Sequence, residues 1–206
     1  MLAGLKKNAA LEKELLTGLQ EEAASKKIPI IDVTTGRFME IICLLTGSRS
    51  ILEIGCGTGF SSYFLIKNLK GGYYTGIDLN QDRIKRAEKF IRSKFPKKQF
   101  KFLVGDALKL IPELQCDFDL VFIDAAKYEY PFYIKAVENK LKSGATVVAD
   151  NIYYKNKIFK RETARHDLKS VNGIKEYISY VTDSDSFSSY FFDIGDGISV
   201  TKFVKK

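Results

Sequence analysis

The feature that most constrains the fold of this 206-residue chain is an alternation of short apolar runs with amphipathic stretches. Short, continuously apolar runs between helical patterns are typical of a parallel sheet covered on both faces. The alternation therefore predicts a doubly wound α/β fold of the Rossmann-like kind. The runs are "SILEIG", "YYTGID", "FKFLVGD", "FDLVFID" and "GATVVAD", and the amphipathic stretches cover about residues 61–69, 81–94 and 130–141.

Both ends of the chain depart from this alternation. Near the C-terminus, "SYFFDIGDGISVTKF" reads as two strands around a Gly-Asp-Gly turn, with no room for a helix between them. We expect an antiparallel hairpin at the sheet edge, which gives seven strands in all. Two helices, at about residues 11–25 and 35–45, should precede the first strand. The segment "KKIPIID" between them should be extended, because Pro29 disfavours helix just before it.

Length and composition fit a single domain over residues 1–206, in which residues 1–46 form helices that lead into the core. No apolar run approaches the roughly 20 residues that cross a bilayer, and the N-terminus lacks the apolar segment of a signal peptide. The three cysteines form no C-x-x-C pair, which argues against a disulfide framework or a zinc site. We therefore expect a cytoplasmic protein with no membrane partner.

The run "LEIGCGTGFSS" predicts a ligand-binding turn after the first strand. Gly55, Gly57 and Gly59 let the backbone turn sharply and approach a ligand closely, and a helix should begin near Phe60. The helix N-terminus offers free N–H groups to a negatively charged group. Asp78 ends the next apolar run, where an acid can accept hydrogen bonds from ribose hydroxyls. A tight turn without a ligand is the alternative, but it would leave this acid without a role.

The spacing of these glycines separates two nucleoside cofactors. A dinucleotide fingerprint reads G-x-G-x-x-G, whereas here position 60 is Phe and the pattern is E-x-G-x-G-x-G. This pattern resembles the loop of class I S-adenosylmethionine (SAM) methyltransferases. The sequence "GDA" at residues 105–107, after the third strand, adds to the likeness. The resemblance implies a Rossmann-like class I methyltransferase with a seven-stranded, mostly parallel sheet and an antiparallel C-terminal strand.

Two further strands end on polar side chains. Asp124 ends the fourth apolar run, and Asp150 and Asn151 end the fifth. Ligands of open α/β sheets bind beyond the carboxyl ends of the strands, so neighbouring strands would bring these side chains together. Two carboxylates and an amide suit Mg²⁺, Mn²⁺ or Ca²⁺, and Lys127 follows one helical turn later. The alternative is that each residue only caps the turn or helix that follows it.

The stretches "FIDAAKYEY", "VADNIYY", "GDGISVTK" and "TTGRFMEII" resemble the cation-dependent O-methyltransferases of the caffeoyl-CoA and catechol type. The resemblance runs from about residue 28 to the C-terminus. It implies that Asp124, Asp150 and Asn151 hold the metal, and that Lys127 is the base or electrostatic partner of the acceptor hydroxyl. The family usually has glycine where Asn156 stands, and asparagine is the next most tolerant residue of a left-handed backbone.

The resemblance also implies a set of cofactor contacts, from the methionine part through the ribose at Asp78 to the adenine near Asp106. The predicted cofactor contacts are Glu53, Gly55, Gly57, Gly59, Ser61, Asp78, Asp106, Ala107 and Asp124, and the predicted catalytic residues are Lys127 and Asp124.

The acceptor is left open between two classes. Residues 155–175 contain seven Lys or Arg against two acids, and this basic stretch directly follows "DN". Phosphates would use such a patch. Together with the stretch "KKIPIID" and the compact size, it resembles bacterial tRNA methyltransferases acting on 5-hydroxyuridine at the wobble position. A small catechol or a phenylpropanoid thioester is the rival.

The basic run at residues 82–101 is interpreted as a solvated helix face, and a homodimer through the apolar N-terminal helices is expected. The patch is represented by Lys155, Lys157, Lys160, Arg161 and Arg165, and the candidates for stacking on a base are Tyr128, Tyr130, Tyr153 and Tyr154.

Overall fold

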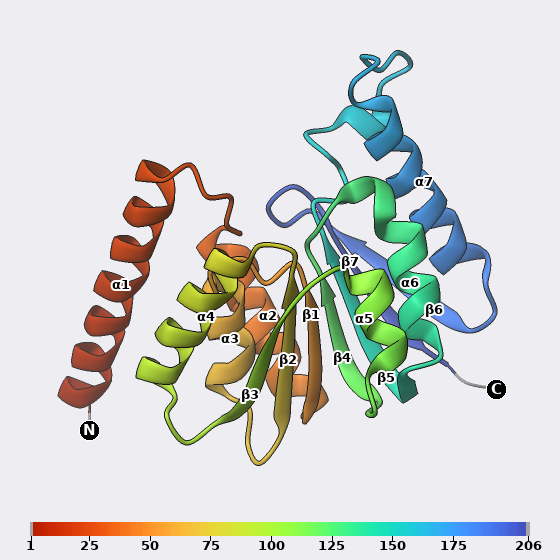
Figure 1. Cartoon of the computed structure of the whole chain (residues 1–206). Helices are drawn as coiled ribbons and strands as arrows, with labels where there is room; N and C mark the ends of the chain where they lie inside the picture. Colours follow the sequence, from red (N-terminus) through yellow and green to blue (C-terminus); the bar gives the residue numbers. More distant parts are fainter. Residues whose placement is uncertain (1, 205–206) are drawn as a thin grey trace.

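The computed structural model describes residues 2–204, with side chains from residue 9 onward. Its centre is one seven-stranded sheet in the order β3-β2-β1-β4-β5-β7-β6 (Figure 1). The first five strands are parallel, and β7 runs antiparallel to both β5 and β6. The predicted α/β fold, with its antiparallel C-terminal strands, is therefore confirmed. The strands are β1 (Ser50–Ile54), β2 (Tyr73–Asp78), β3 (Gln99–Val104), β4 (Phe118–Ile123), β5 (Leu141–Asp150), β6 (Phe187–Phe192) and β7 (Ile198–Phe203).

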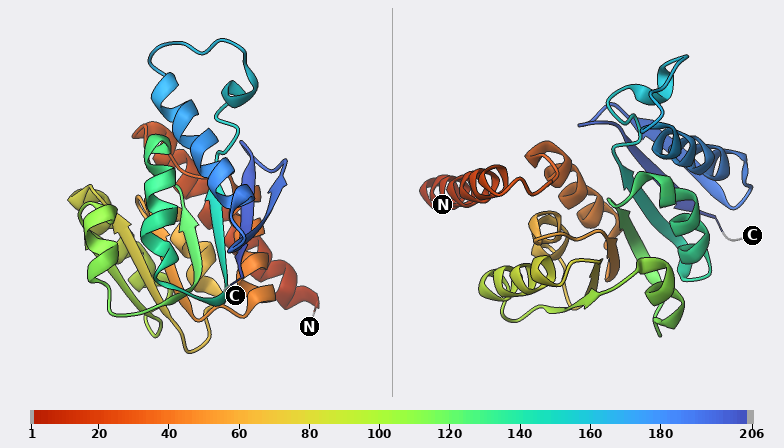
Figure 2. Two further views of the ribbon diagram at one scale, coloured as in Figure 1. Left: turned by 90° about the vertical axis from the view of Figure 1, so that its right-hand side faces the viewer. Right: turned by 45° about the horizontal axis from the view of Figure 1, so that its top comes forward.

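Helices cover both faces of the sheet. On one face α2, α3 and α4 pack side by side, and on the other α5, α6 and α7 do so (Figures 1 and 2). The helix α1 lies outside the first layer and buries Leu16 against it. The helices are α1 (Leu2–Ser25), α2 (Val33–Thr46), α3 (Phe60–Lys67), α4 (Gln81–Lys94), α5 (Ala107–Glu113), α6 (Tyr130–Glu138) and α7 (Leu168–Asp183).

The central strands are buried on both faces, which explains why they read as unbroken apolar runs. In β1, Leu52 and Ile54 enter the core under α5, α6 and α7, whereas Ile51 enters the core under α2, α3 and α4. All five helices expected from the sequence are present. The structure adds α5 and α7, which were not expected from the sequence.

The two segments that flank the parallel sheet follow the sequence expectation. The hairpin β6–β7 forms, with β7 inside the sheet against β5 and β6 as the edge strand. Between α1 and α2, residues 28–31 lie in neither a helix nor a strand, and Asp32 caps α2 by accepting a hydrogen bond from the Thr35 N–H at 2.8 Å. None of the helices in residues 2–204 is both long and apolar enough to cross a membrane.

Candidate active site

A cavity of about 810 Å³ opens at the carboxyl ends of the five parallel strands β1–β5. This is the edge at which open α/β sheets bind ligands. The loops that follow all five strands contribute to its wall, and the α1–α2 linker lines one side. Of the residues singled out from the sequence, the wall contains Gly55, Gly57, Asp78, Asp106, Ala107, Asp124, Lys127, Tyr128, Asp150 and Asn151.

The three glycines after β1 do different work, although all have positive φ angles. A Cβ on Gly55 would lie 2.1 Å from the backbone oxygen of Asp124, so this glycine lets β1 approach the end of β4. A Cβ on Gly59 would lie 3.1 Å from the Ala87 backbone in α4. Gly57 alone faces open space, with nothing within 4 Å of an added Cβ. Gly57 is therefore the glycine that a ligand can approach closely. Gly59 does not line the cavity.

Asp78 braces the glycine turn as well as facing the cavity. Its carboxylate accepts hydrogen bonds from the N–H of Gly57 at 2.9 Å and from the N–H of Asn80 at 2.8 Å. A carboxylate has about four acceptor positions, so two are left for ribose hydroxyls. The predicted ribose acid thus also fixes the loop beside it, a role that was not expected from the sequence.

Glu53 lies beneath the glycine turn and is fully buried. Its carboxylate accepts hydrogen bonds from the hydroxyls of Ser61, Ser62 and Tyr74, the second of them at 2.7 Å. Burial raises the pKa of Glu53 to about 7, against the opposing effect of these three donors. Neither Glu53 nor Ser61 lines the cavity, so their predicted contact with the cofactor stays a prediction.

Asp106 and Ala107 form the cavity wall beyond β3. Asp106 caps α5 by accepting the Leu108 N–H at 3.0 Å, and the buried Ala107 begins that helix. The turn therefore presents a small side chain and a carboxylate side by side. The predicted contact of these two residues with the cofactor stays a prediction.

Asp124, Asp150 and Asn151 come together at the ends of two neighbouring strands. Ile123 of β4 is paired in register with Ala149 of β5, so the acids that follow these two residues end adjacent strands. Asp150 is 2% exposed, and burial together with the Asp124 charge raises its pKa to about 7. Asn151 has φ of 56° and donates its N–H to Asp150 Oδ1 at 2.7 Å.

This donor set fits a hard divalent cation. Two carboxylates and an amide are all-oxygen ligands, and the repulsion that raises the Asp150 pKa is what a cation would relieve. No group of three or more His, Cys, Asp or Glu side chains in the described part of the chain is arranged to hold a metal. The present trio contains only two acids, so that absence leaves metal binding at this position a prediction.

Lys127 is held at the cavity wall by two hydrogen bonds. Its Nζ donates to Asp124 Oδ1 at 2.9 Å and to the Tyr130 hydroxyl at 2.7 Å. Tyr130 in turn donates to the backbone oxygen of Asp150 at 2.9 Å. Because Tyr130 is completely buried, its predicted stacking on an extruded base is wrong. It is instead a positioning residue beneath Lys127, and burial keeps its pKa well above the usual range.

Several residues of the wall were not anticipated from the sequence. Tyr133 comes from α6 after β4, Asn80 follows the ribose acid, and Asp196 comes from the C-terminal hairpin. Among these residues, only Asn80 could have been found from the sequence, because it lies two residues after Asp78. The linker residues and Asp196 reach the cavity only through the tertiary fold. The linker part of the wall consists of Pro29, Ile30, Ile31 and Asp32.

The predicted basic patch lies on the segment 151–167, which projects beyond the body of the molecule next to α7 (Figure 2). Lys155, Lys160, Arg161 and Arg165 are exposed there. Lys157 is not a free cation, because its Nζ donates to the buried Asp167 at 2.7 Å. Two other residues of this segment were also singled out from the sequence. Asn156 adopts the expected left-handed conformation, with φ of 59°, and the Tyr154 hydroxyl donates a hydrogen bond to Asp167 at 3.1 Å.

The strand order, the glycine turn after β1 and the acid after β2 define the class of Rossmann-like, SAM-dependent methyltransferases. More specifically, the chain belongs to the O-methyltransferase family, whose model matches residues 6–204. It is therefore an enzyme of O-methyl transfer. A candidate O-methyltransferase of Mycobacteroides abscessus is 22% identical over 193 residues, which cover 92% of this chain and 88% of that protein.

Solved structures agree with this fold. An O-methyltransferase of Bacillus cereus in complex with S-adenosylhomocysteine (SAH) is 22% identical and has a TM-score of 0.82. The match covers 91% of this chain and 90% of that protein. The O-methyltransferase TomG of Streptomyces achromogenes, in complex with SAM, has a TM-score of 0.83 at 21% identity, covering 92% of this chain and 89% of TomG. A candidate caffeoyl-CoA O-methyltransferase of Staphylococcus aureus has a TM-score of 0.84 at 22% identity, and the match covers 96% of this chain and 98% of that protein.

Proposed function

We propose that this enzyme is a divalent-metal-dependent O-methyltransferase, which moves the methyl group of SAM to a chelating hydroxyl, that of 5-hydroxyuridine at the tRNA wobble position. One observation carries the proposal. A single cavity of about 810 Å³ is lined both by the glycine turn with Asp78 and by the trio of Asp124, Asp150 and Asn151. A methyl donor and a metal-held acceptor would therefore meet in one space.

The donor half of the cavity is formed by the loops after β1, β2 and β3. Gly57 allows close approach, Asp78 offers two free acceptor positions to a ribose, and Asp106 with Ala107 forms an edge for adenine. SAM brings a methyl group on a positively charged sulfur, so the protein has to align an oxygen nucleophile with it. Alignment of this kind supplies several kcal/mol of barrier reduction.

The acceptor half is formed by the ends of β4 and β5. When bound, a divalent cation supplies Lewis acidity that lowers the pKa of a hydroxyl and fixes its position. Asp124, Asp150 and Asn151 would hold that cation. A hydroxyl beside a second oxygen can share it, as in a catechol or in 5-hydroxyuridine, whose hydroxyl is next to the C4 carbonyl.

Lys127 either accepts the proton of the acceptor hydroxyl or stabilises the negative charge on its oxygen. Its Nζ is oriented by Asp124 and Tyr130, and its side chain is 13% exposed, on the cavity side. A nitrogen fixed at this point can receive the hydroxyl proton or stabilise the oxyanion. Tyr130 orients this nitrogen and takes no proton itself.

Two features support an RNA acceptor. Four exposed cations on the segment 151–167 form no ion pair with any described acid, and phosphates would engage them. Tyr128 lines the cavity, and the Lys169 Nζ lies 3.7 Å from its ring centroid, so an aromatic ring and a cation adjoin at the cavity wall. The rival, a small catechol or a caffeoyl-CoA-like thioester, is favoured by the pairing of Lys157 with Asp167, which weakens the patch.

Charge reversal separates these two acceptors. Lys160→Glu, Arg161→Glu and Arg165→Glu together should lower kcat/KM for tRNA about tenfold or more, while transfer to a test catechol persists. Lys13→Glu, Lys70→Glu and Lys97→Glu make the same change in net charge at exposed positions elsewhere and serve as the control. The substrate is tRNA from a strain that lacks the enzyme. Equal activity of both triple variants on tRNA would favour the small acceptor.

Metal removal tests the other half of the proposal. Excess EDTA should abolish transfer to either acceptor, and added Mg²⁺ should restore it, because the acceptor then regains its position and its acidity. Turnover that is undiminished in EDTA would remove the metal from the mechanism.

A further inference from the structure

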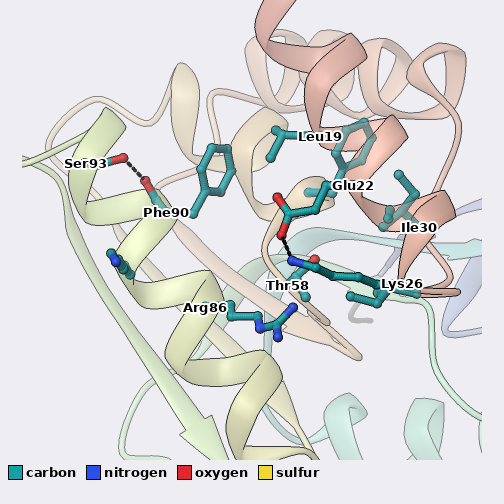
Figure 3. Close-up of a pocket in the computed structure, with 12 residues that line it drawn as sticks. Leu19, Glu22, Lys26, Ile30, Thr58, Arg86, Phe90 and Ser93 are labelled. Atoms are coloured by element: carbon teal, nitrogen blue, oxygen red, sulfur yellow. Dashed lines mark hydrogen bonds and ion pairs between the residues drawn. The ribbon is translucent and has the colours of Figure 1, made fainter.

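A second cavity, of about 410 Å³, lies between α1, the start of α3 and α4 (Figure 3). Its volume is within the range of small-molecule sites, about 300–1,000 Å³. It is separate from the active site, and the mechanism uses none of its side chains. Its wall consists of Leu19, Glu22, Ala23, Lys26, Ile28, Ile30, Thr58, Phe60, Arg86, Lys89, Phe90 and Ser93.

The wall of this cavity is divided between apolar and cationic groups. Leu19, Ala23, Ile30, Phe60 and Phe90 give it an apolar surface drawn from α1, the linker, α3 and α4. Figure 3 shows the Leu19 and Phe90 side chains on one side of the space and the Arg86 guanidinium across from Glu22 and Lys26. An apolar body with a charged end would match both parts.

The sign of the charge is set by the cations that remain unpaired. Lys26 forms an ion pair with Glu22, and chiefly Lys26, with a contribution from Arg86, holds the pKa of Glu22 below its usual range. Glu22 is the single acid of the wall, against three cations. Within the described residues, Arg86 and Lys89 have no hydrogen-bond or ion-pair partner. The wall is therefore net positive, and its two exposed cations that form no ion pair with a described residue lie three residues apart on one face of α4.

We propose that this cavity is a binding site for a small amphipathic anion, with a hydrocarbon or aromatic body between α1 and α4 and a carboxylate or phosphate at Arg86 and Lys89. The free cations on an apolar wall carry this assignment. Arg86 and Lys89 are both exposed to solvent, so they can reach the charged end of an anion but offer no favourable contact to a neutral or cationic molecule. The site goes beyond the proposed methyl transfer and does not depend on its acceptor.

The site shares walls with the active-site cavity. Ile30 of the linker lines both cavities, and Thr58 lines the second one while its neighbour Gly57 lines the first. Gly57 is the turn residue that Asp78 holds by a hydrogen bond. A molecule in the second cavity therefore presses on the loop and the linker that surround the proposed cofactor, and its occupancy should alter SAH affinity.

Three probes that each contain eight carbons test the site in the full-length protein. They are octanoate, octyl phosphate and octylammonium, and each is titrated by calorimetry. We expect the two anions to bind with one molecule per chain and octylammonium at least tenfold more weakly. The two anions distinguish a carboxylate from a phosphate ligand. Arg86→Glu should weaken both anions at least tenfold, whereas Lys85→Glu, the exposed neighbour outside the cavity, should change them less than twofold.

A second variant addresses the apolar half. Ala23→Phe should occupy part of the cavity and weaken anion binding at least tenfold, with thermal unfolding confirming that the variant is folded. Binding that survives both Ala23→Phe and Arg86→Glu, or equal affinity for octylammonium, would overturn the site. SAH affinity is measured with and without octyl phosphate, and we expect a change of at least threefold. An unchanged SAH affinity would overturn the coupling through Ile30 and Thr58 but would leave the site itself in place.

Discussion

At the scale of single residues, the position of Lys127 depends on a buried hydroxyl. Tyr130 accepts from the lysine Nζ at 2.7 Å and donates to the Asp150 backbone oxygen at 2.9 Å. Tyr130→Phe keeps the ring in the core but removes both bonds, so the lysine is oriented by Asp124 alone. We expect kcat to fall about tenfold with SAH affinity unchanged, and stability to fall by about 1–2 kcal/mol.

The matched control for this prediction is Tyr177→Phe. Tyr177 is also completely buried, and its hydroxyl is hydrogen-bonded to Ser199 at 2.9 Å, away from the cavity. It should lose similar stability without the loss of rate. If both variants lost rate equally, the Tyr130 hydroxyl would have only a structural role.

Glu53 makes folding stability depend on pH in an unusual direction. Burial raises its pKa to about 7, from 4.5 in the unfolded chain. The folded state therefore keeps the proton between these values, and raising the pH through them destabilises the protein. Since a pKa difference of one between the folded and unfolded states corresponds to about 1.4 kcal/mol, the native protein should lose up to roughly 3 kcal/mol relative to Glu53→Gln. Urea unfolding of both proteins at pH 5 and pH 8 measures this difference, and parallel pH profiles would contradict it.

The polar residues of the site show which parts of it can be predicted from sequence. Asp124, Asp150 and Asn151 could be predicted because each follows an apolar strand, and strand ends of a parallel sheet share one edge. The support of Lys127 by Tyr130 could not, since a tyrosine three residues after the lysine looks the same whether it is buried or exposed. The pairing of Lys157 with Asp167 likewise depends on how the loop folds back.

At the scale of elements, α4 was predicted with its final bounds, whereas α7 was overlooked. The α4 helix has a strong signal, with Asn80 as its cap and a buried face formed by Ile84, Ala87 and Ile91. The α7 helix has an equally regular apolar face, including Ile174 and Tyr177, but it follows a basic loop directly. The basic charge continues from the loop into the helix and hides the boundary between them. The seven-residue α5, with Pro112 inside it, is too short for helical periodicity to be visible.

The attachment of α1 depends on one acid. Burial alone would raise the pKa of Glu12, but hydrogen bonds from Arg37, Lys67 and Tyr63 outweigh it and lower that pKa to about 2. Glu12→Gln should loosen α1 from α2 and α3 by roughly 1–2 kcal/mol and open the linker to trypsin after Lys26 and Lys27.

The control for this change is Glu21→Gln, at an exposed position on the same helix. It should leave the rate of cleavage unchanged. Because the Glu12 carboxylate is charged above its folded pKa, wild-type protection against pepsin, which cleaves in acid where trypsin does not, should decline as the pH falls from 4.5 towards 2. Equal cleavage of both variants at neutral pH would show that apolar packing, and not Glu12, holds α1.

At the scale of the whole molecule, an exposed apolar surface joins α2 to the sheet edge. Ile41 and Leu45 are 52% and 79% exposed on α2, and Tyr190 is 66% exposed on the edge strand β6. The rings of Phe38 and Phe192 lie 5.5 Å apart and connect the two elements. Apolar surfaces and open strand edges of this kind mark sites of association. The predicted dimer contact through the N-terminal helices stays a prediction, and this surface would extend it to β6.

This surface predicts a homodimer in solution that can be disrupted by charge. Leu45→Glu with Tyr190→Lys should turn the dimer into monomers in sedimentation velocity, because an isologous contact brings each new charge into the apolar interface of both copies. Phe132→Glu, at a 51% exposed position on α6, changes a similar side chain on the other face of the sheet and should leave the dimer intact. A wild-type protein that sediments as a monomer at micromolar concentration would contradict the assignment. Loss of the dimer in Phe132→Glu alone would instead move the interface to the α6 face.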